Sequence, residues 1–297
     1  MSTKASFLLT LLLLFSLSCA DDQLAPPLIT TDEFSIIAEL PGSIKESSGI
    51  FYSDAGFLWT HNDSGDASII YNIDLNQGSV VKTLNLENVE HVDWESVTQD
   101  DEHVYIGDIG NNNGTRTDLA IHKFPTVALQ NNDSVAVSTI TFTYADQNDF
   151  SSKEKHNFDC EAMIPLDDQL FLFTKNRANL ETNIYTVSKD PGTYILEQAN
   201  NFAVDGFITA AAINKQSTRI CLLGYDINEP PFKPFIWLIS DFQGSDFLNG
   251  KLRRINLDLS VQTEAICFVH DDLIYFTSEA ESGRAAFVYA LDLSKWW

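Results

Sequence analysis

The stretch Thr263-Glu-Ala-Ile-Cys-Phe268 belongs to a phrase that recurs along the chain, in which a small or acidic residue precedes an apolar-rich run. The five copies start at Ser48, Glu95, Glu161, Thr209 and Glu264. Each copy is followed, about eight to twelve residues later, by a second apolar run. The starts are separated by 47, 66, 48 and 55 residues, the range in which one repeat forms one four-stranded propeller blade. The spacing therefore predicts an all-β chain that folds as a five-bladed β-propeller.

Within each repeat, the recurring phrase is expected to be the innermost strand. In the last copy, one face carries Gln262, Glu264, Ile266 and Phe268 and the other carries Thr263, Ala265, Cys267 and Val269, and we interpret this alternation as a strand that is buried on both sides. The three glutamates and two hydroxyl residues that start the phrases thus occupy one repeated position. A radial fold would direct all five toward a common axis.

The last repeat contains only three predicted strands, whereas the alternating run from Glu33 to Leu40 is left over near the other end. We expect this N-terminal run to complete the last blade and close the ring. In the third repeat, the fourth strand is predicted at Tyr194–Gln198. The 66-residue interval contains polar insertions, so a six-bladed ring with one degenerate blade remains an alternative.

Residues 1–18 have the pattern of a bacterial export signal, with Lys4 before an apolar stretch from Ala5 to Leu17. Cys19 follows directly and is predicted to carry a lipid anchor, with residues 19–32 as a tether and 33–297 as the propeller domain. The expected location is the bacterial cell envelope, as an outer-membrane lipoprotein that faces the periplasm or the exterior. An ordinary secretory signal, which would release a secreted soluble protein, is the alternative.

The formal net charge of −24 opposes both phosphate backbones and anionic lipid headgroups. We therefore expect no nucleic-acid partner, and membrane contact only through the anchor. The chain is expected to be a monomer. The remaining cysteines, Cys160, Cys221 and Cys267, fall in predicted strands of different repeats and are interpreted as buried free thiols.

The turns after the second strands should share one rim of the ring with the phrase residues, and these turns are rich in polar side chains. Turn formation explains the Asn, Asp, Ser and Gly residues in part. The other side chains predict a pocket for a small polar ligand over the axis. The candidate ligand-binding residues are His61, Asp63, Asp66, Asp108, Lys175, Arg177, Tyr225 and Glu279.

Glu95, Glu161 and Glu264 could not all remain ionised around one axis without a counter-charge. Oxygen-only ligands, with no paired His or Cys nearby, favour a hard cation of adaptable geometry, so calcium is preferred over zinc or magnesium. The alternative is that the glutamates accept hydrogen bonds from backbone amides and hold a column of water without a metal.

The phrases Trp94-Glu-Ser-Val97 and Cys160-Glu-Ala-Met163 resemble those of the calcium-activated nucleotidase (apyrase) family, a five-bladed propeller with one axial calcium. They are also similar to phrases in uncharacterised secreted bacterial propeller lipoproteins. The apyrase resemblance implies a Ca²⁺ cofactor, and threonine replaces serine in the fourth blade. The implied metal ligands are Ser48, Glu95, Glu161, Thr209 and Glu264.

The catalytic part of this resemblance is incomplete, because the family's phosphate-handling turns are rich in arginine. Here Asp63 or Asp108 could position a water molecule, and Lys175 and Arg177 could contact phosphate, which normally requires clustered cations. The leading hypothesis is a binding protein with an axial calcium. A calcium-dependent, apyrase-like phosphohydrolase is the alternative, so whether the protein is an enzyme stays open.

Overall fold

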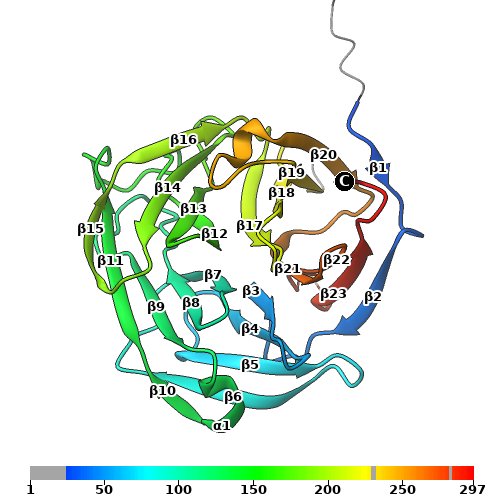
Figure 1. Ribbon diagram of the computed structural model, residues 1–297, viewed down its shortest axis with the longest axis horizontal. Helices are drawn as coiled ribbons and strands as arrows, with labels where there is room; N and C mark the ends of the chain where they lie inside the picture. Colours follow the sequence, from blue (N-terminus) through cyan, green and yellow to red (C-terminus); the bar gives the residue numbers. More distant parts are fainter. Residues whose placement is uncertain (1–24, 229–231, 281–282) are drawn as a thin grey trace, which may run out of the picture.

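The computed structural model describes residues 25–228, 232–280 and 283–297, and these residues form five sheets around a central axis (Figure 1). The innermost strands contact one another around the ring in the order β3, β7, β12, β17, β21 and back to β3. The prediction of an all-β, five-bladed propeller is therefore confirmed. The predicted signal residues 1–18 and Cys19 lie outside the described residues.

Each blade is a meander whose strands run outward from the axis. The first sheet contains β3 (Ser47–Tyr52), β4 (Leu58–Asn62), β5 (Ile69–Asp74), β6 (Ser79–Glu87) and β10 (Ser134–Ala136). The second contains β7 (Trp94–Gln99), β8 (His103–Asp108), β9 (Ala120–Pro125), β11 (Ser138–Tyr144) and β15 (Gly192–Leu196). The third contains β12 (Cys160–Leu166), β13 (Gln169–Thr174), β14 (Thr182–Ser188) and β16 (Gln198–Phe202).

The fourth and fifth sheets bring in the N-terminal residues. The fourth contains β17 (Phe207–Ile213), β18 (Arg219–Asp226), β19 (Lys233–Ser240), β20 (Lys251–Leu257) and β1 (Leu28–Ile29). The fifth contains β21 (Thr263–His270), β22 (Leu273–Ser278), β23 (Phe287–Asp292) and β2 (Phe34–Glu39). The described helices are α1 (Ala128–Asn131) and the 3₁₀ turn η1 (Phe247–Asn249), and neither is long and apolar enough to cross a membrane.

The ring closes through β2, which pairs antiparallel with β23 from the other end of the chain (Figure 1). Phe34 packs its ring edge against Phe276 and Tyr289, so the closing strand is held by side chains as well as by the ladder. The predicted closure by residues 33–40 is confirmed. Leu28 and Ile29, assigned above to the tether, instead pair parallel with β20, and Ile29 is fully buried.

One strand assignment was wrong. Tyr194 and its neighbours form β15, which pairs parallel with β11 of the second blade, and the fourth strand of the third blade is β16. Leu196 is buried in the cluster between these two blades, so β15 covers the outer edge of β11. Alternation alone does not specify which sheet edge a strand joins. The long second interval contains β10, α1 and β11, so these residues form no sixth blade.

Five hydrophobic clusters of described residues fill the spaces between neighbouring blades. Because each blade is covered on both faces, its central strands are apolar on both sides. Cys160, Cys221 and Cys267 are buried within these clusters and unpaired, as expected.

Candidate functional site

The residues that start the five recurring phrases share a backbone feature. In each innermost strand the register shifts at this residue, which is skipped in the pairing with the second strand. A β-bulge leaves one residue out of the ladder and changes the direction of its side chain. The five skipped residues are Ser48, Glu95, Glu161, Thr209 and Glu264, all of them buried.

The three glutamates at these bulges are close enough to affect one another's ionisation. Burial raises the pKa of Glu95 well above its usual value, and the charge of Glu161 raises it further. Burial likewise raises the pKa of Glu161, and the charge of Glu264 raises it further. Burial also raises the pKa of Glu264, to about 7. The ring therefore concentrates carboxylates in one poorly solvated place.

Hydroxyl and amide groups beside the axis supply further polar contacts. The Ser48 hydroxyl donates to Glu95 Oε2 at 3.0 Å, and Gln262 Nε2 donates to Glu264 Oε1 at 2.6 Å. The Thr209 hydroxyl donates to the Thr263 carbonyl oxygen at 2.7 Å, which leaves its oxygen as an acceptor.

Two basic side chains neutralise part of this charge. Lys175 Nζ lies 3.1 Å from Glu161 Oε1, and both side chains are buried. Arg177 donates from Nε and Nη2 to Asp159 Oδ2, at 2.9 and 2.8 Å, and its Nη2 lies 4.0 Å from Glu161. The two side chains expected to face a ligand are thus paired with carboxylates of the third blade.

A second group of carboxylates lies beside Glu95 and has no basic partner. Oxygens of Asp63, Asp93 and Glu95 lie within 4.8 Å of one another. Burial raises the pKa of Asp93 to about 7, and the charge of Asp63 raises it further. Among the described residues, none of the three has a Lys or Arg nitrogen within 4.0 Å. This group, the Asp63–Asp93–Glu95 cluster, can hold a cation.

The sequence analysis did not select Asp93. The available signal was its position two residues before Glu95, which places both side chains on the same face of an extended strand. Gly110 also belongs to this arrangement, because a β-carbon there would collide with carboxylate oxygens of Asp93 and Glu95. The cluster thus depends on a glycine from the next turn.

Asp108 and His61 make contacts within their own surroundings in the protein. Asp108 accepts hydrogen bonds from the backbone N–H groups of Val92 and Asp93 and pairs with Arg116 at 2.8 Å. It therefore positions the backbone that carries Asp93. His61 is completely buried, its Nδ1 contacts the Asn62 carbonyl oxygen, and burial lowers its pKa to about 4.

The remaining candidates divide into two groups. Asp66 accepts hydrogen bonds from the Asn62 amide and the Tyr71 hydroxyl within its own blade. Tyr225 lies beside Lys175, whose Nζ is 5.8 Å from the ring centre. Burial and the charge of Glu264 raise the pKa of Glu279 to about 8, and Glu279 lines a small cavity of about 290 Å³. Tyr225 and Glu279 thus border the axial carboxylates, whereas Asp66 stabilises a turn.

Comparisons with known proteins define the architecture only. No family model and no curated protein matches the chain. An exo-β-1,3-galactanase from Phanerochaete chrysosporium, solved with β-1,3-galactotriose, is 12% identical with a TM-score of 0.52, over 88% of this chain and 65% of that chain. At this identity the similarity extends to the fold and no further.

Two bacterial structures are similar over comparable lengths. A PQQ-bound aldose sugar dehydrogenase from Streptomyces coelicolor is 12% identical with a TM-score of 0.48, over 90% of this chain and 99% of that chain. A putative TolB from Agrobacterium tumefaciens is 12% identical with a TM-score of 0.44, over 84% of this chain and 78% of that chain. The sheet topology and the positions of the bulges define the class, a five-bladed β-propeller with buried carboxylates on its innermost strands.

Proposed function

We propose that this protein binds calcium at the Asp63–Asp93–Glu95 cluster and presents it to a small polar ligand, as a binding protein of the bacterial cell envelope. The supporting observation is that a bulge in every blade directs a buried residue to the axis, and one group of carboxylates there has no basic partner in the described part of the chain.

The chemistry of the donors favours calcium. Buried carboxylates repel one another, and a divalent cation relieves this repulsion while it stabilises their ionised form. Carboxylate oxygens and the Ser48 hydroxyl are hard ligands, and calcium accepts six to eight of them in variable geometry. Glu161 contributes less than the apyrase resemblance implies, because Lys175 already occupies one of its oxygens.

Calorimetric titration of calcium into chelator-treated protein tests this proposal. We expect saturable binding by the wild type, its loss in Glu95→Gln and a weaker site in Asp93→Asn. Glu161→Gln should weaken binding by about 10- to 100-fold, since it leaves the Lys175 charge unpaired beside the site.

Glu197→Gln is the matched control, because Glu197 is exposed. The Glu197→Gln protein should bind calcium as tightly as the wild type does. Absence of saturable binding by the wild type, or unchanged binding by Glu95→Gln, would contradict the proposal.

The phosphohydrolase alternative has less support. Phosphate binding requires available cations, whereas Lys175 and Arg177 are paired with Glu161 and Asp159. Assays with nucleoside diphosphates, with and without a chelator, distinguish the two functions, and we expect no calcium-dependent turnover.

A further inference from the structure

A cavity with a volume of about 1260 Å³ is lined by the far ends of the innermost strands and by the turns that follow them. Tyr52, Gln99 and His270, for example, end β3, β7 and β21. The axial carboxylates lie at the opposite ends of the same strands. This cavity, the distal mouth, is therefore separate from the Asp63–Asp93–Glu95 cluster.

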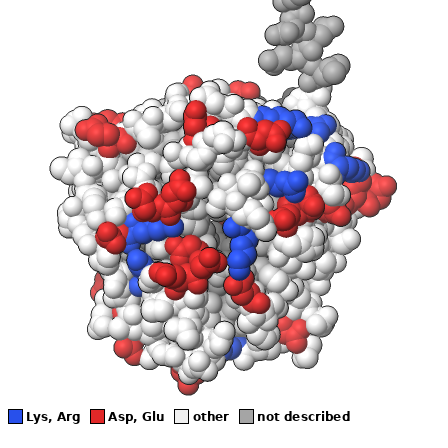
Figure 2. Space-filling model, viewed as in Figure 1, with Lys and Arg blue, Asp and Glu red and all other residues white. Residues whose placement is uncertain are grey.

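The charge around the distal mouth favours a cation. Five aspartates and three lysines line it, which leaves two negative charges in excess. Figure 2 shows a hollow near the middle of one face of the ring, with acidic and fewer basic side chains beside it. Two of the lysines already have partners, because Lys189 lies 3.0 Å from Asp100 and Lys82 donates to the carbonyl oxygens of Leu129 and Gln130.

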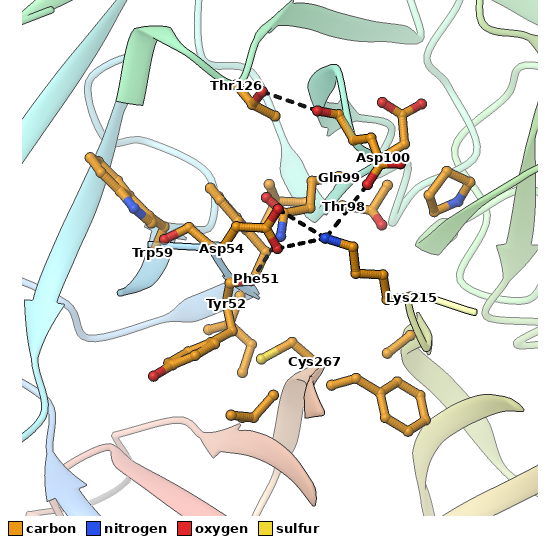
Figure 3. A pocket seen from close by; sticks show the side chains of 18 of the residues that line it. Phe51, Tyr52, Asp54, Trp59, Thr98, Gln99, Asp100, Thr126, Lys215 and Cys267 are labelled. Carbon is orange, nitrogen blue, oxygen red and sulfur yellow. Dashed lines mark hydrogen bonds and ion pairs between the residues drawn. The ribbon is translucent and has the colours of Figure 1, made fainter. Parts of the chain in front are cut away.

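The third lysine, Lys215, forms an exposed bridge between blades. Its Nζ lies 2.9 Å from Asp54 Oδ2 and 3.7 Å from Asp101 Oδ1, and it points across the cavity toward Asp54 (Figure 3). The side chains of Lys215, Asp54 and Asp101 are 62%, 80% and 84% exposed. An ion pair this exposed is screened by water and contributes little to stability, so a ligand ammonium can replace the lysine at little cost.

Next to these carboxylates lies an apolar wall with one unsatisfied polar atom. Phe57, Val81 and Val127 are large apolar side chains that remain 49%, 55% and 63% exposed, and all three line the distal mouth. Trp59 and Asn72 also line it, and Asn72 Oδ1 is buried and accepts no hydrogen bond from the described residues. A buried acceptor without a donor is unfavourable, and a hydrogen-bond donor on a ligand would satisfy it.

We propose that the distal mouth binds a small amphipathic organic amine. The ammonium group replaces Lys215 between Asp54 and Asp101, the apolar body covers Phe57, Val81 and Val127, and a hydrogen-bond donor on that body reaches Asn72. This site does not depend on the proposed calcium site.

Calorimetry with a set of indole compounds of different charge tests the proposal. The probes are tryptamine (cationic), tryptophol (neutral) and indole-3-acetate (anionic), each titrated into calcium-saturated and into chelator-treated protein. We expect tryptamine to bind about tenfold more tightly than tryptophol, a difference equivalent to 1.4 kcal/mol, in both preparations. Indole-3-acetate should bind with the lowest affinity.

A methylated probe tests the hydrogen bond to Asn72. Since 1-methyltryptamine lacks the indole N–H, it should bind to the wild type more weakly than tryptamine does. The Asn72→Leu variant should bind the two compounds with equal affinity.

Variants at exposed positions locate the site. Asp54→Asn combined with Asp101→Asn should remove the preference for tryptamine over tryptophol, and Lys215→Ala should increase tryptamine affinity. The control is Asp205→Asn, an exposed aspartate outside the distal mouth, which should not change binding. Equal affinity for the three probes, unchanged preference in the double variant, or no saturable tryptamine binding up to about 10 mM would overturn the proposal.

Discussion

The Lys175–Glu161 pair is a buried contact between opposite charges, with an N–O distance of 3.1 Å. Taking both groups out of water is costly, and their attraction offsets this cost only while both are present. The pair therefore contributes little net stability, but removal of either partner should destabilise the fold. It also reduces the number of axial carboxylates that would be available to the proposed calcium ion.

Lys175→Met should lower the free energy of unfolding by about 3–5 kcal/mol in the presence of a chelator, because the Glu161 carboxylate loses its counter-charge. Urea denaturation measures this loss, and the double variant with Glu161→Gln should recover most of it. Lys251→Met, at an exposed lysine, is the control. A Lys175→Met protein as stable as the wild type would show that the pair has no such role.

The β-bulge is the element that turns a repeated strand into a site. Each innermost strand is buried on both faces, so its residues would otherwise point into the spaces between blades. The skipped residue leaves this pattern and is directed toward the axis. Closure by β2 also holds this arrangement together, because it keeps the innermost strand of the fifth blade, β21, beside that of the first blade, β3.

Phe34→Ala should destabilise the protein by about 3 kcal/mol, because it removes a buried ring that attaches β2 to Phe276 and Tyr289. Ile36→Ala in the same strand is the control, since Ile36 is 58% exposed and should change stability by less than about 0.5 kcal/mol. Thermal and urea unfolding measure the stability of both variants. Equal losses in the two variants would show that backbone pairing alone holds the closing strand.

For the whole molecule, the raised pKa values of the carboxylates at the axis link stability to pH. The folded-state pKa is about 7 for both Asp93 and Glu264 and about 8 for Glu279, in each case primarily because of burial. The unfolded chain releases these protons at lower pH. Between the unfolded-state and the folded-state pKa of each carboxyl group, the folded protein therefore binds more protons than the unfolded chain does. Stability must then fall as the pH rises through that window.

We therefore expect the melting temperature in a chelator to decrease from about pH 5 to pH 8, as the raised carboxylates ionise. Calcium should raise the melting temperature more at pH 8 than at pH 5, because it binds the ionised form. Differential scanning calorimetry at both pH values measures this. A calcium effect of equal size at both would count against binding at these carboxylates.

The proposed location also concerns the whole molecule. If Cys19 carries a lipid, labelled palmitate should be incorporated into the wild type and not into Cys19→Ser when each is expressed in bacteria, and only the wild type should sediment with membranes. Cys221→Ser is the matched control, because this thiol is buried within the propeller. Incorporation of label into Cys19→Ser would exclude an anchor at this residue.

The sequence by itself determined the propeller class, the closing strand and the five residues that start the phrases, because strand alternation and repeat length are local properties that every blade must satisfy. It favoured five blades over six, and the structure decided between them. It did not place β15, since alternation specifies which side of a strand is buried but not which sheet edge the strand joins. Only the tertiary structure paired Lys175 with Glu161, brought Asp93 and Asp63 to Glu95, and formed the distal mouth. Lys175 and Glu161 belong to one blade and meet across its strands, whereas the cluster and the distal mouth join residues from different blades, so their distances depend on how the ring closes.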